Sequence, residues 1–208
     1  MKIIDISWPL QKNVTEYKNR ETFKIEQFAT YETRGFEESK ICLGAHTGTH
    51  IDSPRHFVEN GKTIDQIDLN QLSGICQILD LTNVEEKITT KDLEKFEIKK
   101  NEIILLKTKN SFLNSTDPFN PDFIYLESSG AQFLASKNIK SIGIDYLGIE
   151  RNQPGHLTHK AFLSKNIPII EGLRLVEAIE MHYYFTCLPL KLISTEAAPA
   201  RAILTELS

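Results

Sequence analysis

The stretch that organises this chain reads His46-Thr47-Gly48-Thr49-His50-Ile51-Asp52-Ser53-Pro54-Arg55-His56. It contains three of the six histidines of the chain. Alternate side chains of a strand point to the same face, so an extended backbone places His46, Gly48, His50 and Asp52 together. The residues between them are β-branched, which favours a strand. Because Pro54 cannot continue a ladder, we expect the strand to end near Ser53.

The residues of this face form a ligand set for a metal. Imidazole together with carboxylate suits zinc, manganese or iron. Three ligands from His46, His50 and Asp52 leave a position open for water, as in catalytic sites. His56 lies just past the predicted turn, where it can face the site without being a ligand. The alternative interpretation is a β-hairpin with polar surface residues, which the spacing of these side chains disfavours.

A second group of candidates lies later in the chain. Glu171 follows the apolar run Ile167-Pro168-Ile169-Ile170, where an unpaired charge would be costly. A metal ion would neutralise that charge. His159 precedes this run, and a single histidine on a short helix is usually an ordinary surface or core residue.

Composition narrows the class of protein. The chain has 208 residues without a Pro/Gly/Ser-rich linker, so we expect one domain over 1–208. A net charge of −4 with dispersed basic residues argues against nucleic acid as a partner. No run of 18 apolar residues predicts a membrane span, and no signal peptide is expected. The three cysteines are far apart and flanked by apolar residues, which predicts packing roles in a reducing, cytoplasmic compartment.

Hydrophobic periodicity predicts a strand-rich, mixed α/β chain. We expect a short helix that begins at Thr90 and further helices over 128–137 and 159–164. A helical turn is expected within 63–72. The first strands, together with the histidine strand, are predicted to form an antiparallel meander. The predicted strands cover 2–7, 23–31, 38–43, 76–81, 103–107, 141–146, 167–171, 183–193 and 201–207.

The histidine stretch resembles the signature H-x-G-T-H-x-D-x-P-x-H of the cyclase family of metal-dependent hydrolases. That family includes bacterial kynurenine formamidases and isatin hydrolases. The resemblance covers nearly the whole chain and implies a single domain with the swivelling β/β/α fold. It extends to Asp5-Ile6-Ser7, Gly143-Ile144-Asp145, the segment from His159 to Leu173, Leu188-Pro189-Leu190-Lys191 and Ala198-Pro199-Ala200-Arg201-Ala202.

The resemblance also implies a site. His159 and Glu171 would join His46, His50 and Asp52 to hold two divalent ions, with both carboxylates shared between them. Zinc is the first expectation, with manganese or iron as alternatives. Two such ions activate a water at neutral pH. His56 would be the general acid/base that moves a proton from the attacking water to the leaving amine. Its alternative role is as a further ligand or a hydrogen-bond partner of one.

The implied activity is hydrolysis of a C–N bond in a small molecule, either a formamide such as N-formylkynurenine or a cyclic amide. Alternatives at the same centre are hydrolysis of a lactone or cyclic imide, and elimination of water by a dehydratase. A metal-binding protein without catalysis is a further alternative, but it would have no need of His56. Relatives in this family are commonly dimers or tetramers with an N-terminal loop at the neighbour's site, so we expect a homodimer or homotetramer.

One segment departs from the family. Many relatives carry an aromatic residue followed by Pro-Gly-Asp in the substrate pocket, whereas this chain has Tyr17-Lys18-Asn19-Arg20. We expect Tyr17 to line the pocket. Trp8 is a second candidate, although packing explains it equally well. Asp145 is expected to support the site or its strand end, with Glu150 a further polar candidate nearby. The other two histidines, at positions 156 and 182, are expected at the surface or behind the ligands.

Overall fold

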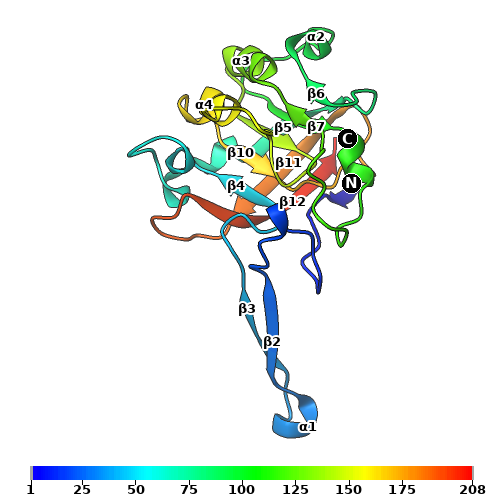
Figure 1. The fold of residues 1–208 in the computed structure, drawn as a ribbon, viewed down its shortest axis with the longest axis vertical. Helices are drawn as coiled ribbons and strands as arrows, with labels where there is room; N and C mark the ends of the chain where they lie inside the picture. The colour runs from blue at the N-terminus through cyan, green and yellow to red at the C-terminus, as the bar shows by residue number, and fades with distance from the viewer. Residues whose placement is uncertain (1, 208) are drawn as a thin grey trace.

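The computed structural model describes residues 2–207 and contains one large mixed sheet (Figure 1). Strand β4 pairs with β12 as well as with β10, so the sheet closes into a barrel-like ring. The fold is strand-rich and mixed α/β, as the sequence predicts. The strand order is β1 (Ile3–Asp5), β12 (Ala197–Glu206), β11 (His182–Pro189), β5 (Ser73–Asp80), β7 (Ile103–Lys107), β9 (Ser141–Ile144), β10 (Ile169–Glu171) and β4 (His50–Asp52).

The centre of this sheet is parallel and buried on both faces. Strands β5, β7, β9 and β10 run parallel to one another. Strand β7 alternates between two hydrophobic clusters, because Ile103 and Leu105 join one while Ile104 and Leu106 join the other. Burial on both faces explains its unbroken apolar sequence. The first cluster lies among the strands of the ring, and the second lies under the helices.

Helices cover the second cluster along one side of the sheet (Figure 1). They are α2 (Thr90–Leu93), α3 (Ser128–Ser136) and α4 (Leu157–Leu163), beside the small parallel pair β6 (Lys87–Ile88) and β8 (Tyr125–Leu126). None of the helices within residues 2–207 has the length and apolar character that a membrane crossing requires. Single 3-10 turns occupy Tyr17–Asn19, Pro54–His56, Ile64–Gln66, Leu69–Gln71 and Lys109–Phe112.

An arm projects away from the body of the molecule (Figure 1). It consists of β2 (Lys24–Ala29) and β3 (Glu38–Cys42), which pair only with each other, and of the short helix α1 (Tyr31–Arg34) at its tip. Strand β1 pairs with β12 instead. The predicted meander is therefore wrong: its strands form locally, but their partners come from the far end of the chain.

The predicted strand over the histidine stretch is also shorter than expected. Only His50–Asp52 is extended, and Gly48 adopts a left-handed conformation with φ of 62°. The backbone of Gly172 crosses this bend so closely that a Cβ there would lie 2.3 Å from the Gly48 carbonyl oxygen. Two segments far apart in sequence therefore meet at this bend. The strand does end before Pro54, as predicted.

Most later elements lie where the sequence predicts them. The strand over 103–107 is confirmed, and the helix predicted over 128–137 ends one residue earlier. Helix α2 begins at Thr90, as predicted, and Thr89 precedes it as the cap, with its amide donating to Asp92 Oδ2. Helix α4 begins at Leu157, two residues before the prediction, and β12 begins at Ala197 rather than at 201.

Candidate metal centre

The threonines of the histidine stretch hold its bend in place. Thr49 Oγ1 accepts a hydrogen bond from the Trp8 amide and donates to the Gly172 carbonyl. Thr47 Oγ1 accepts from the Gly44 amide. The bend is thereby fixed to the segments that directly follow β1, β10 and β3. It holds His46 close to the start of β4.

The sequence-predicted ligands come together where β4 pairs with β10. His50 and Glu171 face each other across the antiparallel pair, and Asp52 follows two residues along β4. The loop before β4 supplies His46, and α4 supplies His159. His46 Nδ1 lies 3.0 Å from Asp52 Oδ1, and His50 Nε2 lies 3.3 Å from Glu171 Oε2.

Each carboxylate faces histidines on two sides. Asp52 Oδ1 lies 3.5 Å from His50 Nε2, while Oδ2 lies 3.7 Å from His159 Nε2. Glu171 divides its oxygens in the same way, with Oε2 toward His50 and Oε1 at 3.4 Å from His159 Nε2. Asp52 and Glu171 therefore both lie between His50 and His159, and His46 joins the cluster at Asp52 Oδ1.

The central polar atoms lack ordinary partners. Within residues 2–207, His50 Nε2 and both Asp52 oxygens are buried without a hydrogen bond of correct geometry. Such atoms are costly to bury unless something else satisfies them. Two ligands about 2.1 Å from a tetrahedral ion are separated by about 3.4 Å, which lies within the observed donor separations of 3.0 to 3.7 Å. The residues fit a divalent metal.

The carboxylates of the cluster also favour a positive charge between them. Burial opposes the protonated form of His50, but Glu171 and Asp52 outweigh it and raise its pKa to about 9. Burial likewise opposes protonation of His159, whose pKa is raised to about 10 by Glu150, Glu171 and Asp52. The carboxylates thus stabilise cations in this space, and a metal ion is the cation that neutral imidazoles can bind.

Contacts behind the ligands orient them. His50 Nδ1 lies 2.9 Å from the Gly48 carbonyl, so it carries the proton and leaves the Nε2 lone pair for a ligand. The Ile149 amide donates to Glu171 Oε1 at 2.7 Å. Asp145 is fully buried and accepts four hydrogen bonds from Thr108 and Ser111, which fixes the end of β9 as expected.

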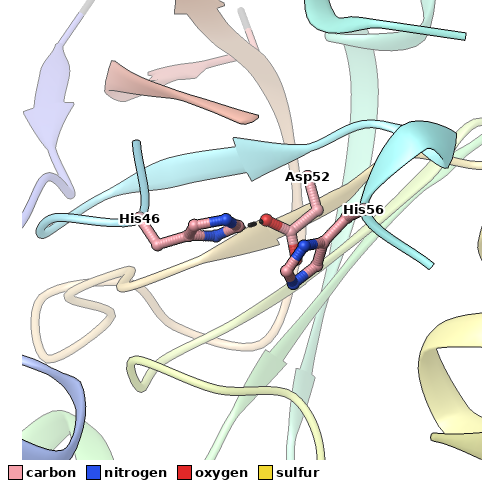
Figure 2. A group of neighbouring side chains, drawn as sticks. All are labelled: His46, Asp52 and His56. Atoms are coloured by element: carbon pink, nitrogen blue, oxygen red, sulfur yellow. Dashed lines mark ion pairs between the residues drawn. The ribbon is translucent and has the colours of Figure 1, made fainter. Parts of the chain in front are cut away.

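His56 faces the same centre from the 3-10 turn after β4. Figure 2 shows His46 and His56 both directed toward Asp52. The His56 and His46 rings lie 4.4 Å apart, and His56 also borders the cavity described below. A nitrogen of His56 lies within 4.8 Å of donors from His46 and Asp52, so this geometry permits either the proton-transfer role or the ligand role.

Sequence reasoning missed Glu196 as a neighbour of the predicted ligands, whereas His156 lies behind them, one of the two positions expected for it. Glu150, expected only as a polar candidate, is buried with Oε2 3.2 Å from His159 Nδ1, and His156 Nδ1 lies 2.6 Å from its other oxygen. Glu196 Oε1 lies 3.4 Å from His46 Nε2. The position of Glu150 on the segment between β9 and α4 is the one signal that could have identified it.

A cavity of about 460 Å³ opens over the cluster. His46, His56, His159 and Glu171 border it, and Tyr17 lines it as predicted. Trp8 does not line this cavity: it is buried and packs edge-on against Tyr146, 5.9 Å between ring centroids. The packing interpretation of Trp8 is therefore the one that fits the structure. Tyr17 is packed against Phe119, which positions its ring at the cavity wall.

The remaining polar residues have simpler surroundings. His182 lies at the surface, 3.5 Å from Glu102. Cys76 and Cys187 are buried thiols, as predicted, and burial raises the pKa of Cys76 to about 12. Cys42 lies exposed on the arm, so the packing role predicted for it is wrong.

Comparisons with known proteins show the family and the fold. A model of the family described as "Putative cyclase" matches residues 4–151. A kynurenine formamidase of Bacillus thuringiensis subsp. konkukian is 32% identical over 204 residues, 97% of this chain and 96% of that protein. A solved structure described as a "predicted metal-dependent hydrolase from Bacillus stearothermophilus" is 43% identical, with a TM-score of 0.87 and coverage of 98% and 97%. Isatin hydrolase A from Labrenzia aggregata shares the fold, with a TM-score of 0.87 at 20% identity and coverage of 100% and 94%.

Proposed function

The chain belongs to the cyclase family, and we propose that it is a metal-dependent hydrolase that cleaves a C–N bond in a small formamide or cyclic amide. Its kynurenine formamidase relatives, matched over nearly the whole chain, support the class of bond. The observation that carries the proposal is the position of the two shared carboxylates, Asp52 and Glu171, beneath a cavity that His56 also borders.

The five residues would hold two ions. His46 and His50 would hold one ion and His159 the other, with Asp52 and Glu171 available to both. The ions would supply Lewis acidity and a water acidic enough to react at neutral pH. Zinc is our first choice because the imidazole and carboxylate set and the donor separations suit it, with manganese or iron as alternatives.

His56 would move the proton. An imidazole can take a proton from the attacking water and return it to the departing nitrogen, so that the nitrogen leaves as a neutral amine. Phe57, adjacent in the chain, packs edge-on against the His56 ring, with 4.2 Å between the ring centroids, and limits its orientation. Tyr17 would hold the substrate against the opposite wall of the cavity.

A screen of metal-replete protein tests this proposal. Protein supplied in turn with zinc, manganese and iron would be assayed on formamides, lactams, cyclic imides and lactones. We expect the highest kcat/KM on a formamide or lactam, and loss of turnover after chelation that added metal restores. A preference for lactones, imides or a dehydration would move the activity to another bond at the same centre. Bound metal with no turnover of any of these would leave a metal-binding protein and contradict the proposal.

We also propose that the chain acts as a homodimer or homotetramer in the cytoplasm. The arm supports the assembly, because it extends from the body and exposes apolar side chains that a second copy could cover. The described cysteines are free thiols, in keeping with a reducing compartment.

A further inference from the structure

The loop over residues 16–22 forms one wall of the cavity and is held firmly. The buried carboxylate of Glu16 accepts hydrogen bonds from the amides of Thr22 and Phe23 and from the Thr22 hydroxyl. Asn19 Oδ1 accepts from the Phe119 amide at 3.0 Å. These contacts fix the backbone at both the base and the tip of the loop, so Lys18 and Arg20 project from a fixed wall of the cavity.

This loop presents two cations to the cavity. Lys18 and Arg20 both line it, and both lie over the Tyr17 ring, at 5.2 and 5.7 Å from its centroid. Lys18 and Asn19 have φ of 53°, a left-handed conformation that side chains disfavour. The lysine and arginine ion pairs within residues 2–207 involve only Lys109, Arg151 and Arg201. The two loop cations therefore have no acidic partner in the described chain.

The carboxylates that line the cavity are, by contrast, all engaged. Glu16 holds the loop. Glu150 accepts from the amides of Thr158 and His159 and from the His156 ring. Glu171 accepts from the Ile149 amide and faces the histidines of the metal centre. A ligand in this cavity meets two unpaired cations and no unpaired anion.

From this imbalance we propose that the cavity selects substrates with a free carboxylate and no neighbouring ammonium, bound by Lys18 and Arg20. The inference rests on the proposed function, because the amide of the same substrate would lie at the metal centre. Tyr17 and Phe57 give the cavity aromatic walls, which suits a flat aryl body between the two ends. Arg20 can bind a carboxylate with two parallel N–H donors, and Lys18 adds a second charge. The substrate class is a net-anionic aryl amide.

A series of aryl formamides tests this class. Formanilide is compared with ortho, meta and para formamidobenzoate, which add one carboxylate, and with N-formylkynurenine, which carries a carboxylate beside an ammonium. We expect the wild type to prefer at least one formamidobenzoate over both the neutral and the zwitterionic compound. The preference should weaken as ionic strength rises, because the cations are exposed.

Variants assign the preference to the loop. In Lys18→Gln/Arg20→Gln, the ratio of kcat/KM for formamidobenzoate over formanilide should fall about tenfold, mainly through KM, as expected for two exposed ion pairs. The matched control Lys12→Gln/Lys91→Gln removes the same charge from exposed residues outside the cavity and should keep the ratio within about twofold. An equal fall in both variants, or a wild type that prefers formanilide or N-formylkynurenine, would overturn the inference.

Binding separates this inference from the proposed activity. The affinity of metal-replete protein for benzoate is measured by calorimetry in the wild type and both double variants. Binding that weakens about tenfold only in Lys18→Gln/Arg20→Gln supports the anion site even if no amide is hydrolysed, in which case only the proposed function fails. Equal benzoate affinity in all three proteins overturns the anion site, whatever the activity.

Discussion

The pair β4–β10 at the candidate metal centre and the pair β2–β3 in the arm are both short and antiparallel, yet their surroundings differ. Each residue of β4 is buried, whereas each residue of β3 is exposed. Strand β4 has neighbours on both sides, β10 and β12, while β2 and β3 have only each other. Two short antiparallel pairs thus have opposite surroundings, because burial depends on what the rest of the chain packs against them.

The two regions differ in how many elements of the fold depend on each residue. At the candidate metal centre, the predicted ligands and the residues that support them lie on β4, β10, α4 and the loop before β4. One change there disturbs several elements. In the arm, side chains contact few others within the described chain, so a change there should leave the fold intact. The predictions below test this division.

The largest effect should come from the shared carboxylate. Asp52→Asn keeps the size of the side chain but removes a charge that faces both groups of histidines, so the variant should lose both ions. Activity should fall by about 10³-fold or more, because a catalytic metal supplies several kcal/mol of transition-state stabilisation. His159→Ala should lose mainly one ion. Elemental analysis of protein purified without chelator gives the ions per chain.

The control for both variants is His182→Ala, which removes a histidine that lies outside the cluster. It should retain the metal content of the wild type. Equal metal content in the wild type, Asp52→Asn and His159→Ala would contradict the assignment of these ligands.

The next effect concerns His56. If it moves protons without binding metal, His56→Ala should keep its ions and lose activity by about 10²–10⁴-fold, mostly in kcat. The pH profile should also lose the limb that the imidazole contributes. If His56 is a ligand, the variant instead loses an ion and added metal partly restores activity. Full metal with full activity would refute both roles.

A pair of glycines compares the stability of the two regions. Gly172→Ala places a Cβ against the Gly48 carbonyl at a φ of 71°, so strain and overlap together should cost about 3 kcal/mol. Gly35→Ala in the arm has a φ of 74° but meets no atom within 4 Å, so only the backbone strain of about 1 kcal/mol remains. Melting temperatures should fall by about 10 °C and about 4 °C respectively. Equal shifts would show that the crossing at Gly48 is not tightly packed.

Local signals explain what the sequence predicted well. The strand over Ile103–Lys107 and the helix over Ser128–Ser136 follow from continuous apolar runs and periodicity within each segment. The sequence predicts that His46, His50 and Asp52 lie together, but it predicts a straight strand to bring them there. The structure instead has a bend at Gly48, which still brings His46 toward Asp52. Residue type and closeness in sequence were enough to predict which side chains lie together, but they did not predict the path of the backbone.

Long-range pairing explains what the sequence missed. Strand β4 pairs with β10 and β12, more than a hundred residues away, and no pattern within either segment specifies that choice. Glu196 reaches His46 only because β12 lies beside β4. The alternating pattern in the arm correctly predicts two strands. It also predicts that their apolar face is buried, and it cannot reveal that nothing within the described chain covers that face.

The smallest effect on folding, and the most informative about assembly, concerns that uncovered face. Ile25 and Ile41 lie opposite each other in the arm and remain 54% and 59% exposed. Replacing both by threonine keeps β-branched residues in the ladder, so the free energy of unfolding should change by no more than about 1 kcal/mol. If the arm binds a second copy, however, the loss of apolar surface should shift the protein toward its 23.7 kDa monomer in analytical ultracentrifugation.

The control is Glu26→Thr/Lys40→Thr, the adjacent cross-strand pair, which changes the other face of the same ladder without altering net charge. Dissociation of the isoleucine variant alone would assign the interface to one face of the arm. Equal dissociation of both variants would indicate that the strands themselves are perturbed, and an unchanged oligomer in both would place the interface elsewhere.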